Sequence, residues 1–375
     1  ALKLAPDDHV SYSNLSLAYL KKGDKRQSID WANKALAIKP DSVSARHNLA
    51  LSQLAFGEWK DGWENYEYSI GHNSDRFEYV FGDEPRWDGE KGKCVVAFGE
   101  QGLGDEIAFA SCVPDLMKDC SETIIHCHER LGGLFKRSFP GAFVYGARMK
   151  QEVEWLDTHT PEARVAFGSL PRFYRNRTED FPGTPYLVAD PERRVQWRAL
   201  LDSLGPRKKV GIAWHGGKKS TGEAARSLPL EDLLPVLRQD ATFISLQYTD
   251  PTEEIQLLEE RHGIKVHHWA RAAEARDYDE TAALVAELDC VVSVTTAAIH
   301  LSGALGIPCI VLVPRNPRWF YGMNGESVPW YKSVELIRQK KDWVEPINEA
   351  AVRLRKYLNG DHQLLRSKPS LACVA

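Results

Sequence analysis

The feature of this sequence that most constrains its fold is a repeat with a period of 34 residues near the N-terminus. The residues that recur at this spacing are Pro6 and Pro40, Asp7 and Asp41, Asn14 and Asn48, Leu15 and Leu49, Leu17 and Leu51, and Gly23 and Gly57. A period of this length holds one pair of helices, and a single pair cannot bury its own apolar face. We therefore expect stacked helical pairs that cover one another.

The pattern inside each repeat fits a helical hairpin of the tetratricopeptide type. Two sets of apolar residues fall at helical spacing and are expected to face the core: Leu15, Ala18 and Tyr19, then Ile29, Ala32 and Leu36. Gly23 permits the tight turn between the helices, and Pro40 ends the second helix. Residues 1–6 look like the tail of an earlier repeat, so we expect further repeats before residue 1. Residues 57–63 depart from the pattern and are expected to pack on the next domain, which would cap the array.

The charge balance argues against two classes of partner. The chain has 48 Lys and Arg against 52 Asp and Glu, giving a net charge of −4 and a pI near 6.3. This composition lacks the basic footprint of a nucleic-acid-binding protein and the polybasic segment of a membrane anchor. We expect neither nucleic acid nor membrane as a partner.

The cysteines indicate the redox compartment of the protein, and one uncharged stretch raises the question of a membrane span. The seven cysteines include no CxxC pair, which favours reduced thiols and a cytoplasmic location over a disulfide framework or zinc ribbon. Residues 290–314 contain no Asp, Glu, Lys or Arg, but glycines and prolines interrupt them. We interpret them as a buried strand, helix and strand rather than a membrane span.

From about residue 90 the pattern changes to short apolar runs that alternate with amphipathic stretches. The runs expected to be strands are residues 94–98, 123–128, 142–145, 210–214, 242–246, 266–269, 290–294 and 309–313. Strands alternating with helices predict parallel sheets, and two such series predict two Rossmann-like domains that face a cleft. Residues 171–190 are expected to form loop and linker. The last helix, at about residues 343–358, is expected to cross back to the first of these domains.

The first candidate motif is residues 99–106, which follow a predicted strand. Its glycines, Gly102 and Gly104 among them, allow the backbone to approach a ligand at a helix N-terminus. Asp105 falls in the first helical turn, where a carboxylate can act as a general base. Asp is also favoured there as a helix cap, and spacing alone favours the cap.

The second motif is the basic loop after the strand at residues 210–214. It contains His215, Lys218 and Lys219, with Arg226 shortly after. Glycines and cations after a strand suit a diphosphate, because the charges and the backbone amides can hold its oxygens. An ordinary exposed basic loop is equally compatible with this pattern.

The third motif is residues 293–306, in which a helix is expected to begin at Thr296. Its free N–H groups and the positive end of its dipole would point at the cleft near Thr295 and Ala297, a natural seat for a diphosphate. His300, on the same helix, is more typical of a satisfied core histidine than of a ligand.

Other patterns give weaker signals. His126, Cys127 and His128 lie on a predicted strand, whose alternate side chains face opposite sides, so no metal site is predicted there. Trp319 and Tyr321 are candidates either for stacking on a base or sugar or for packing at the domain junction.

Several segments taken together resemble a known family. Residues 87–89, 99–105, 245–247, 295–306 and 329–331 resemble bacterial tetratricopeptide-repeat glycosyltransferases. The catalytic half is similar to ADP-heptose heptosyltransferases, and the overall architecture is similar to O-GlcNAc transferases and flagellin glycosyltransferases. The resemblance covers about residues 1–345.

This resemblance implies an α + α/β architecture: tetratricopeptide repeats at 1–75, then a GT-B fold of two Rossmann-like domains at 76–190 and 191–345, and a C-terminal helix and tail at 346–375. The first Rossmann-like domain would face the acceptor and the second would bind the nucleotide sugar. It implies metal-independent, inverting transfer with no cofactor. It also implies a protein or peptide acceptor, held in the groove of the repeats.

The resemblance also assigns roles to individual residues. Asp105 matches the aspartate proposed as the base, and Gln247 follows the strand that contacts the nucleoside. The remaining donor-binding positions are Gly102, Gly104, His215, Lys218, Lys219, Arg226, Thr295, Thr296, Ala297 and His300. Thr295 stands where the family usually has Asp, so it can cap a helix but cannot supply a charge.

Two other functions remain open on the sequence. The chain would be a non-catalytic scaffold if the GT-B part were degenerate, and the Thr295 departure favours this slightly. It would alternatively act on glycan or lipid-linked acceptors, with the repeats tethering it to an assembly.

Overall fold

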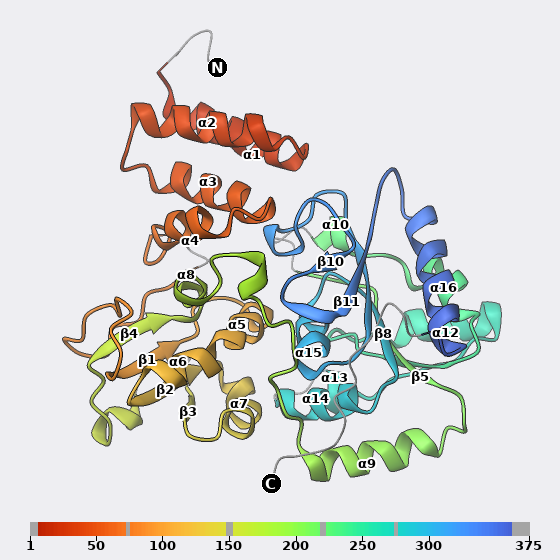
Figure 1. The fold of residues 1–375 in the computed structure, drawn as a ribbon. Helices are drawn as coiled ribbons and strands as arrows, with labels where there is room; N and C mark the ends of the chain where they lie inside the picture. The colour runs from red at the N-terminus through yellow and green to blue at the C-terminus, as the bar shows by residue number, and fades with distance from the viewer. Residues whose placement is uncertain (1–6, 73–75, 148–152, 218–222, 274–276, 362–375) are drawn as a thin grey trace.

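The computed structural model describes residues 7–72, 76–147, 153–217, 223–273 and 277–361 (Figure 1). Helices α1–α4 form a layer at the N-terminal end of the molecule. Two α/β parts follow, each built on its own sheet. We call the sheet β1–β4 with its helices the first half, and the sheet β5–β11 with its helices the second half.

The N-terminal layer consists of two helical hairpins: α1 (His9–Lys21), α2 (Lys25–Ile38), α3 (Val43–Ala55) and α4 (Trp59–Glu67). Asp24 and Ser42 cap α2 and α3 by accepting from backbone N–H groups in the first turn. Gly23 and Gly57 have φ values of 76° and 79°, so each turn uses a conformation that favours glycine. The assignment of these hairpins as tetratricopeptide repeats stays a prediction.

The buried face of α1 differs from the predicted one. Ser13, Ser16 and Leu20 are buried, whereas Ala18 is exposed. The serines are small, and Ser13 accepts hydrogen bonds from the Asn48 amide through both its carbonyl and its hydroxyl oxygen. Small side chains that bond across the interface therefore form this face, which a purely apolar pattern does not identify.

Helix α4 attaches the helical layer to the first half, as the sequence predicted for residues 57–63. The indole of Trp63 is buried and donates to the Arg175 carbonyl at 2.8 Å, and that of Trp59 donates to the Thr178 hydroxyl at 3.0 Å. The layer also reaches the second half, because the Met323 N–H donates to the Ala55 carbonyl at 3.0 Å. The helices thus contact both α/β parts.

The first half contains a parallel sheet in the order β3-β2-β1-β4. Its strands are β1 (Cys94–Phe98), β2 (Glu122–Cys127), β3 (Phe143–Gly146) and β4 (Ala163–Ala166). Its helices are α5 (Leu103–Phe109), α6 (Val113–Asp119), α7 (Gly132–Ser138) and α8 (Pro171–Tyr174). Three of the strands were predicted, and β4 was not.

The second half contains a sheet in the order β10-β11-β9-β8-β5-β6-β7, parallel except for β10. Its strands are β5 (Lys209–Ala213), β6 (Thr242–Ser245), β7 (Val266–His267), β8 (Cys290–Val294), β9 (Cys309–Val313), β10 (Ser327–Val328) and β11 (Tyr331–Arg338). Its helices are α9 (Pro191–Asp202), α10 (Glu223–Arg226), α11 (Leu234–Leu237), α12 (Thr252–His262), α13 (Ala270–Ala273), α14 (Tyr278–Ala286), α15 (Ala297–Leu305) and α16 (Val344–Leu358).

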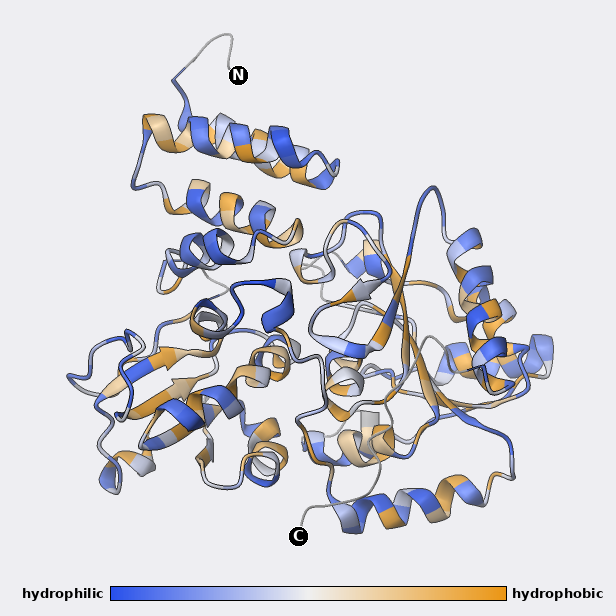
Figure 2. Cartoon of the chain, viewed as in Figure 1, coloured by the Kyte–Doolittle hydropathy of each residue, from blue (hydrophilic) through white to orange (hydrophobic). Residues whose placement is uncertain are grey.

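The uncharged stretch 290–314 forms the centre of this sheet. Every residue of β8 and β9 is buried, and α15 between them is buried along most of its length. Figure 2 shows the strands of both sheets as mainly hydrophobic, whereas the outer helices alternate between hydrophilic and hydrophobic residues. Among the described residues, no helix is long and apolar enough to cross a membrane.

Helix α16 does not cross back to the first half, which corrects the expectation for the last helix. Its Ile347, Ala350 and Leu354 belong to the same buried cluster as residues of β8 and β9 (Figure 1). The Tyr357 hydroxyl donates to the Asp289 carbonyl at 2.7 Å. The apolar stripe of α16 therefore covers the second sheet, and burial of that stripe determines where the helix lies.

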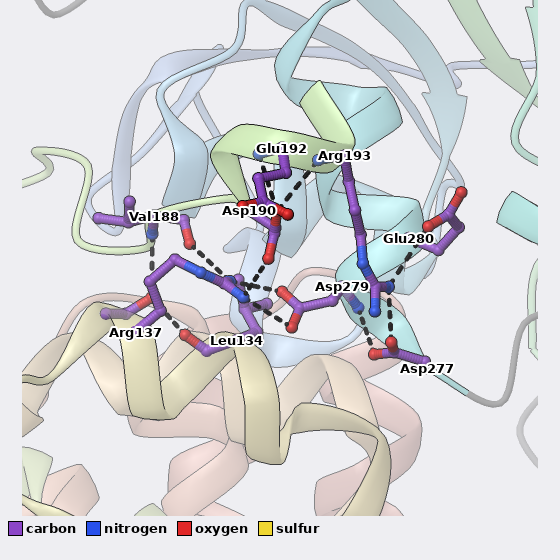
Figure 3. Close-up of polar contacts among 10 residues, drawn as sticks. Leu134, Arg137, Val188, Asp190, Glu192, Arg193, Asp277, Asp279 and Glu280 are labelled. Atoms are coloured by element: carbon purple, nitrogen blue, oxygen red, sulfur yellow. Dashed lines mark hydrogen bonds and ion pairs between the residues drawn. The ribbon is translucent and has the colours of Figure 1, made fainter. Parts of the chain in front are cut away.

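An ion-pair cluster joins the two halves on one side. Arg137 at the end of α7 donates to both carboxylate oxygens of Asp279 on α14, at 2.7 and 3.1 Å, and to Asp190 at 3.0 Å (Figure 3). Asp190 also caps α9 by accepting from the Arg193 N–H. A two-pronged arginine–carboxylate contact fixes orientation as well as distance, so this cluster holds α7 against α14.

Candidate functional site

A pocket of 510 Å³ lies between the two halves. The segment after β1 contributes residues 100–105, and Arg130 follows β2. The second half contributes residues 295–298 at the start of α15, together with Arg226 of α10 and residues 318–321. The carboxyl ends of parallel strands are where ligands bind in open α/β folds.

The wall from the first half is the N-terminus of α5. Gly102 is the N-cap, and Asp105 lies in the first turn, where its Oδ2 accepts from the Gly102 N–H at 3.2 Å. The capping role that spacing favoured is thus present. The same carboxylate lines the pocket and is only partly exposed. The capping hydrogen bond orients the Asp105 side chain. Because Asp105 also lines the pocket, its geometry is compatible with a role as a base.

Gly104 lies where α5 meets α15. A Cβ at this position would be 2.9 Å from Cδ2 of His300 and 3.3 Å from Cα of Ala297. A distance under 3 Å requires something to shift. Gly104 therefore allows close contact between the two halves, a structural role that the sequence analysis did not distinguish from ligand approach.

The wall from the second half is the N-terminus of α15. Thr296 is the N-cap, and its hydroxyl accepts from the Ala298 N–H at 3.2 Å. The first N–H groups of a helix have no partner within the helix, and they carry the positive end of its dipole. Ala297 and Ala298, with their small side chains, line the pocket at this point. This end of the helix can accept an anion.

Thr295 adds a buried donor beside this helix end. It is 1% exposed and lines the pocket, and its hydroxyl has no hydrogen-bond partner among the described residues. A buried hydroxyl without a partner costs free energy. A ligand oxygen in the pocket would supply the missing partner.

Three guanidinium groups line the pocket among the described residues. Arg226 donates to the Thr295 carbonyl at 3.4 Å, which places its charge beside the α15 N-terminus. Arg318 and Arg130 are the other two. Burial lowers the pKa of Arg226, and the charge of Arg318 lowers it further. Arg226 and Arg318 therefore repel one another.

His300 is a core histidine whose ring also reaches the pocket. It is 7% exposed, with Nδ1 at 3.3 Å from the Tyr331 hydroxyl and Nε2 at 3.5 Å from the Tyr321 hydroxyl. Phe320 meets its ring edge-on, with centroids 4.6 Å apart. Burial, with a smaller contribution from Arg318, lowers the pKa of His300 to about 3. The imidazole is therefore neutral at physiological pH.

Two residues predicted to bind the donor are not among the pocket-lining residues. Gln247 is fully buried, and its amide bonds the N–H and the carbonyl of His215 at 3.0 and 3.3 Å. His215 in turn contacts Glu254, with Nε2 2.6 Å from Oε1. Both residues brace the loop after β5, because their polar groups are occupied by the protein itself. Lys218 and Lys219 lie outside the described residues.

A buried polar network behind Asp105 was missed by the sequence analysis. Arg76 and Glu100 form an ion pair at 3.1 Å, with 0% and 2% of each residue exposed. Gln101 donates to Glu100 at 2.9 Å and accepts from the Tyr66 hydroxyl at 2.9 Å. Burial raises the pKa of Glu100, and Arg76 opposes this shift. Tyr66 belongs to α4, so the helical layer directly supports the loop that carries Asp105.

The aromatic residues at 319–321 lie at the junction of the parts, as one interpretation predicted, and stacking on a base or sugar stays a prediction. Trp319 and Tyr321 line the pocket. Trp319 also contacts Trp63 of α4 edge-to-face, with ring centroids 5.5 Å apart. One cluster therefore forms part of the pocket wall and part of the contact with the helical layer.

The structure shows no grouping of three or more His, Cys, Asp or Glu side chains able to hold a metal within its described residues. His126 is buried and accepts from the indole of Trp155 at 3.3 Å. His128 accepts from the Arg130 N–H at 3.2 Å instead. The two histidines of this strand segment thus have different surroundings.

Comparison with known proteins gives one long relative by sequence. No family model matches the chain. Protein FlbA of Caulobacter vibrioides is 30% identical over 388 aligned positions, which cover 95% of this chain and 63% of FlbA. The chain therefore spans less than two thirds of that relative.

Comparison of structures identifies the fold of the α/β part. A crystal structure of glycosyl transferase family 9 from Veillonella parvula matches 74% of this chain and 99% of its own, with 12% identity and a TM-score of 0.52. The ADP-heptose LPS heptosyltransferase II of E. coli matches 71% of this chain and 97% of its own, with 11% identity and a TM-score of 0.48. The fold assignment rests on the Veillonella structure. Two sheets, the first parallel and the second parallel except for β10, lie on either side of one pocket, which is consistent with the predicted GT-B fold.

Proposed function

We propose that this chain is a glycosyltransferase that moves a sugar from a nucleotide-sugar donor to an acceptor hydroxyl, with inversion and without a metal. One observation supports the proposal: Asp105 and the N-terminal end of α15 line the same pocket between the halves. The fold that the chain shares with the Veillonella glycosyl transferase family 9 structure supports it.

The second half provides the donor site in this proposal. The α15 N-terminus, the Thr295 hydroxyl and Arg226 converge on one region of the pocket and would hold the diphosphate. Fixed donors of this kind stabilise negative charge as it develops on a leaving group. The guanidinium of Arg226 and the positive end of the α15 dipole would balance the negative charge of the diphosphate, so the proposal requires no metal.

The chemical step is a direct displacement. The acceptor oxygen attacks the anomeric carbon while Asp105 accepts the proton from the acceptor hydroxyl. The bond between the anomeric carbon and the diphosphate oxygen breaks, and the nucleoside diphosphate leaves with that electron pair. A single displacement inverts the configuration at the anomeric carbon.

A protein or peptide is the acceptor in this proposal. In this proposal α1–α4 are tetratricopeptide repeats, within residues 1–75. The acceptor binds the domain at 76–190 and the donor binds the domain at 191–345. Residues 346–375 form the C-terminal helix and tail. The hydrogen bond from Tyr66 of α4 to Gln101 in the pocket wall supports this arrangement, because it joins the helical layer to the pocket.

The test is Asp105→Asn, which keeps the size and the capping oxygen of the side chain but removes the base. We expect transfer of radiolabelled sugar to protein to fall at least about a hundredfold, with nucleotide affinity unchanged. Asp83→Asn, at an exposed position, is the matched control and should retain full transfer. Unchanged transfer in Asp105→Asn would refute the proposed role. A folded protein that binds no nucleotide would instead favour the scaffold function.

A further inference from the structure

Arg130 is a pocket residue that no sequence motif indicated. It lies in the 3₁₀ helix η2 (Glu129–Leu131), directly after β2, and it is the cation that the first half contributes to the described pocket wall. Its backbone N–H donates to Nδ1 of His128. Its guanidinium lies against the ring of Tyr278 of α14, at 5.3 Å from the centroid. Arg130 thus extends from one half to an aromatic residue of the other.

The guanidinium of Arg130 is only partly satisfied by the protein. Its Nε is buried and has no hydrogen-bond partner within the described part of the chain. Nor does any carboxylate of that part form an ion pair with it, whereas Arg137, Arg175 and Arg193 all have such pairs. A partly desolvated cation without an anion is costly, unless a ligand supplies the negative charge.

The rest of the pocket is also rich in positive charge. Arg226 and Arg318 line it with Arg130, against the carboxylates of Glu100 and Asp105. Arg76, which is not a lining residue, neutralises Glu100 through an ion pair. Glu100 is paired with Arg76, so Asp105 is the other carboxylate among the described lining residues. The three guanidinium groups therefore outnumber it. A pocket with excess charge of one sign concentrates ligands of the opposite sign.

We infer that Arg130 is the anion-binding residue of the first half, and that it binds a phosphate or carboxylate group of the ligand. The pocket would then bind anionic groups from both sides, through Arg226 and α15 in the second half and through Arg130 in the first. This inference deepens the proposed function and rests on it for the identity of the ligand. The anionic group belongs either to the donor diphosphate or to an acid on the acceptor side.

The experiment compares the wild-type protein with Arg130→Gln by calorimetry. The probes are UDP, GDP, ADP and dTDP with their matching monophosphates, followed by inorganic phosphate titrated into the protein saturated with the best nucleotide. Arg315→Gln, at an exposed arginine outside the pocket lining, is the matched control. Arg130→Lys keeps the charge without the two-pronged geometry and guards against a folding defect in the glutamine variant.

Two results support the inference and identify the source of the anion. If Arg130→Gln weakens the diphosphate by about tenfold to a hundredfold and the monophosphate much less, the anion is a donor phosphate. If nucleotide affinities are unchanged but phosphate no longer binds the nucleotide-saturated protein, the anion lies on the acceptor side. Arg130→Lys should fall between the wild type and Arg130→Gln in either case.

Two further results separate this inference from the proposed function. If no nucleotide binds but inorganic phosphate binds and requires Arg130, the donor assignment fails and the anion site stands. If Arg130→Gln melts like the wild type and matches it with every probe, the inference is overturned.

Discussion

The hydroxyl of Tyr66, on the last helix of the N-terminal layer, donates a hydrogen bond of 2.9 Å to Oε1 of Gln101 in the pocket wall. The amide of Gln101 is thereby held at both ends, because its Nε2 donates to Glu100 at 2.9 Å. The loop that leads to Asp105 is therefore positioned by a helix far from it in the sequence. The helical layer is part of the structure of the site and not only an attached arm.

Tyr66→Phe removes this hydrogen bond and keeps the ring. We expect turnover to fall about tenfold, because small displacements of a reacting group lower the rate steeply. Stability should fall by only about 1 kcal/mol. The transfer rate measures turnover, and a denaturant titration measures stability. Tyr68→Phe, at a half-exposed tyrosine, is the control for both. Equal turnover in the two variants would show that Tyr66 does not position the loop.

Arg76→Met leaves the buried Glu100 carboxylate without its partner. We expect a loss of about 3–5 kcal/mol in the free energy of unfolding, since an isolated buried charge is poorly tolerated. Adding Glu100→Gln should recover part of that loss, because the charge is then removed as well. Urea unfolding of both variants measures this. A double variant no more stable than Arg76→Met would contradict the account of the pair.

Gly104→Ala tests the contact between α5 and α15. The added methyl would lie 2.9 Å from Cδ2 of His300, so we expect a loss of about 1–3 kcal/mol. His300→Ala opens space at the same point. The double variant should therefore be more stable than the sum of the two single losses predicts. Strict additivity in thermal unfolding would mean that the two side chains do not meet.

The neutral state of His300 predicts a pH dependence of stability. Its folded pKa of about 3 lies below its ordinary value of 6.5. The unfolded chain therefore binds a proton that the folded one does not. Stability from this group is fully present above pH 6.5 and is lost as the pH falls from 6.5 toward about 3. The loss is at most about 1.4 kcal/mol per pH unit.

His300→Gln removes the titrating group from this balance. The difference in unfolding free energy between wild type and variant should shrink from about pH 7 to about pH 5, because only the wild type loses stability through His300. Urea titrations at several pH values in this range measure it. A difference independent of pH would show that His300 is not buried in the neutral form.

The elements that were predicted well are those with an unambiguous pattern. Strands β8 and β9 have the predicted bounds, because all five residues of each are buried and Ser293 is the one polar residue among them. Strand β4 was missed because it has four residues and contains Arg164. Strand β11 was missed because Lys332 and Glu335 interrupt its apolar pattern. The pattern of a strand depends on what covers each face, and neighbours distant in sequence determine that.

The candidate site could be predicted where a motif lies at a strand end. Asp105, Thr295 and Arg226 follow separate strands and meet in one pocket, as parallel sheets require. Arg130 and Tyr66 carry no local motif, and only the folded chain brings them to the pocket wall or its support. Gln247 was predicted to face the donor, but its amide braces a loop, which depends on backbone groups that a sequence pattern does not show.

Thr295→Val removes the buried hydroxyl at constant size. Because that hydroxyl has no partner in the described structure, the free variant should be as stable as the wild type or slightly more so. A ligand phosphate would lose one donor, so nucleotide affinity should fall about tenfold. Thermal melting with and without nucleotide separates the two effects. Lower stability of the free variant would contradict the unsatisfied hydroxyl.

In the proposed function, the pocket between the halves binds the nucleotide of a sugar donor. Calorimetric titration of UDP, GDP, ADP, dTDP and CMP into the wild type and into Arg226→Ala tests it most directly. We expect selective binding of one nucleotide, weakened at least about tenfold in the variant. A folded wild-type protein that binds none of them, or a variant that binds as tightly as the wild type, would contradict it.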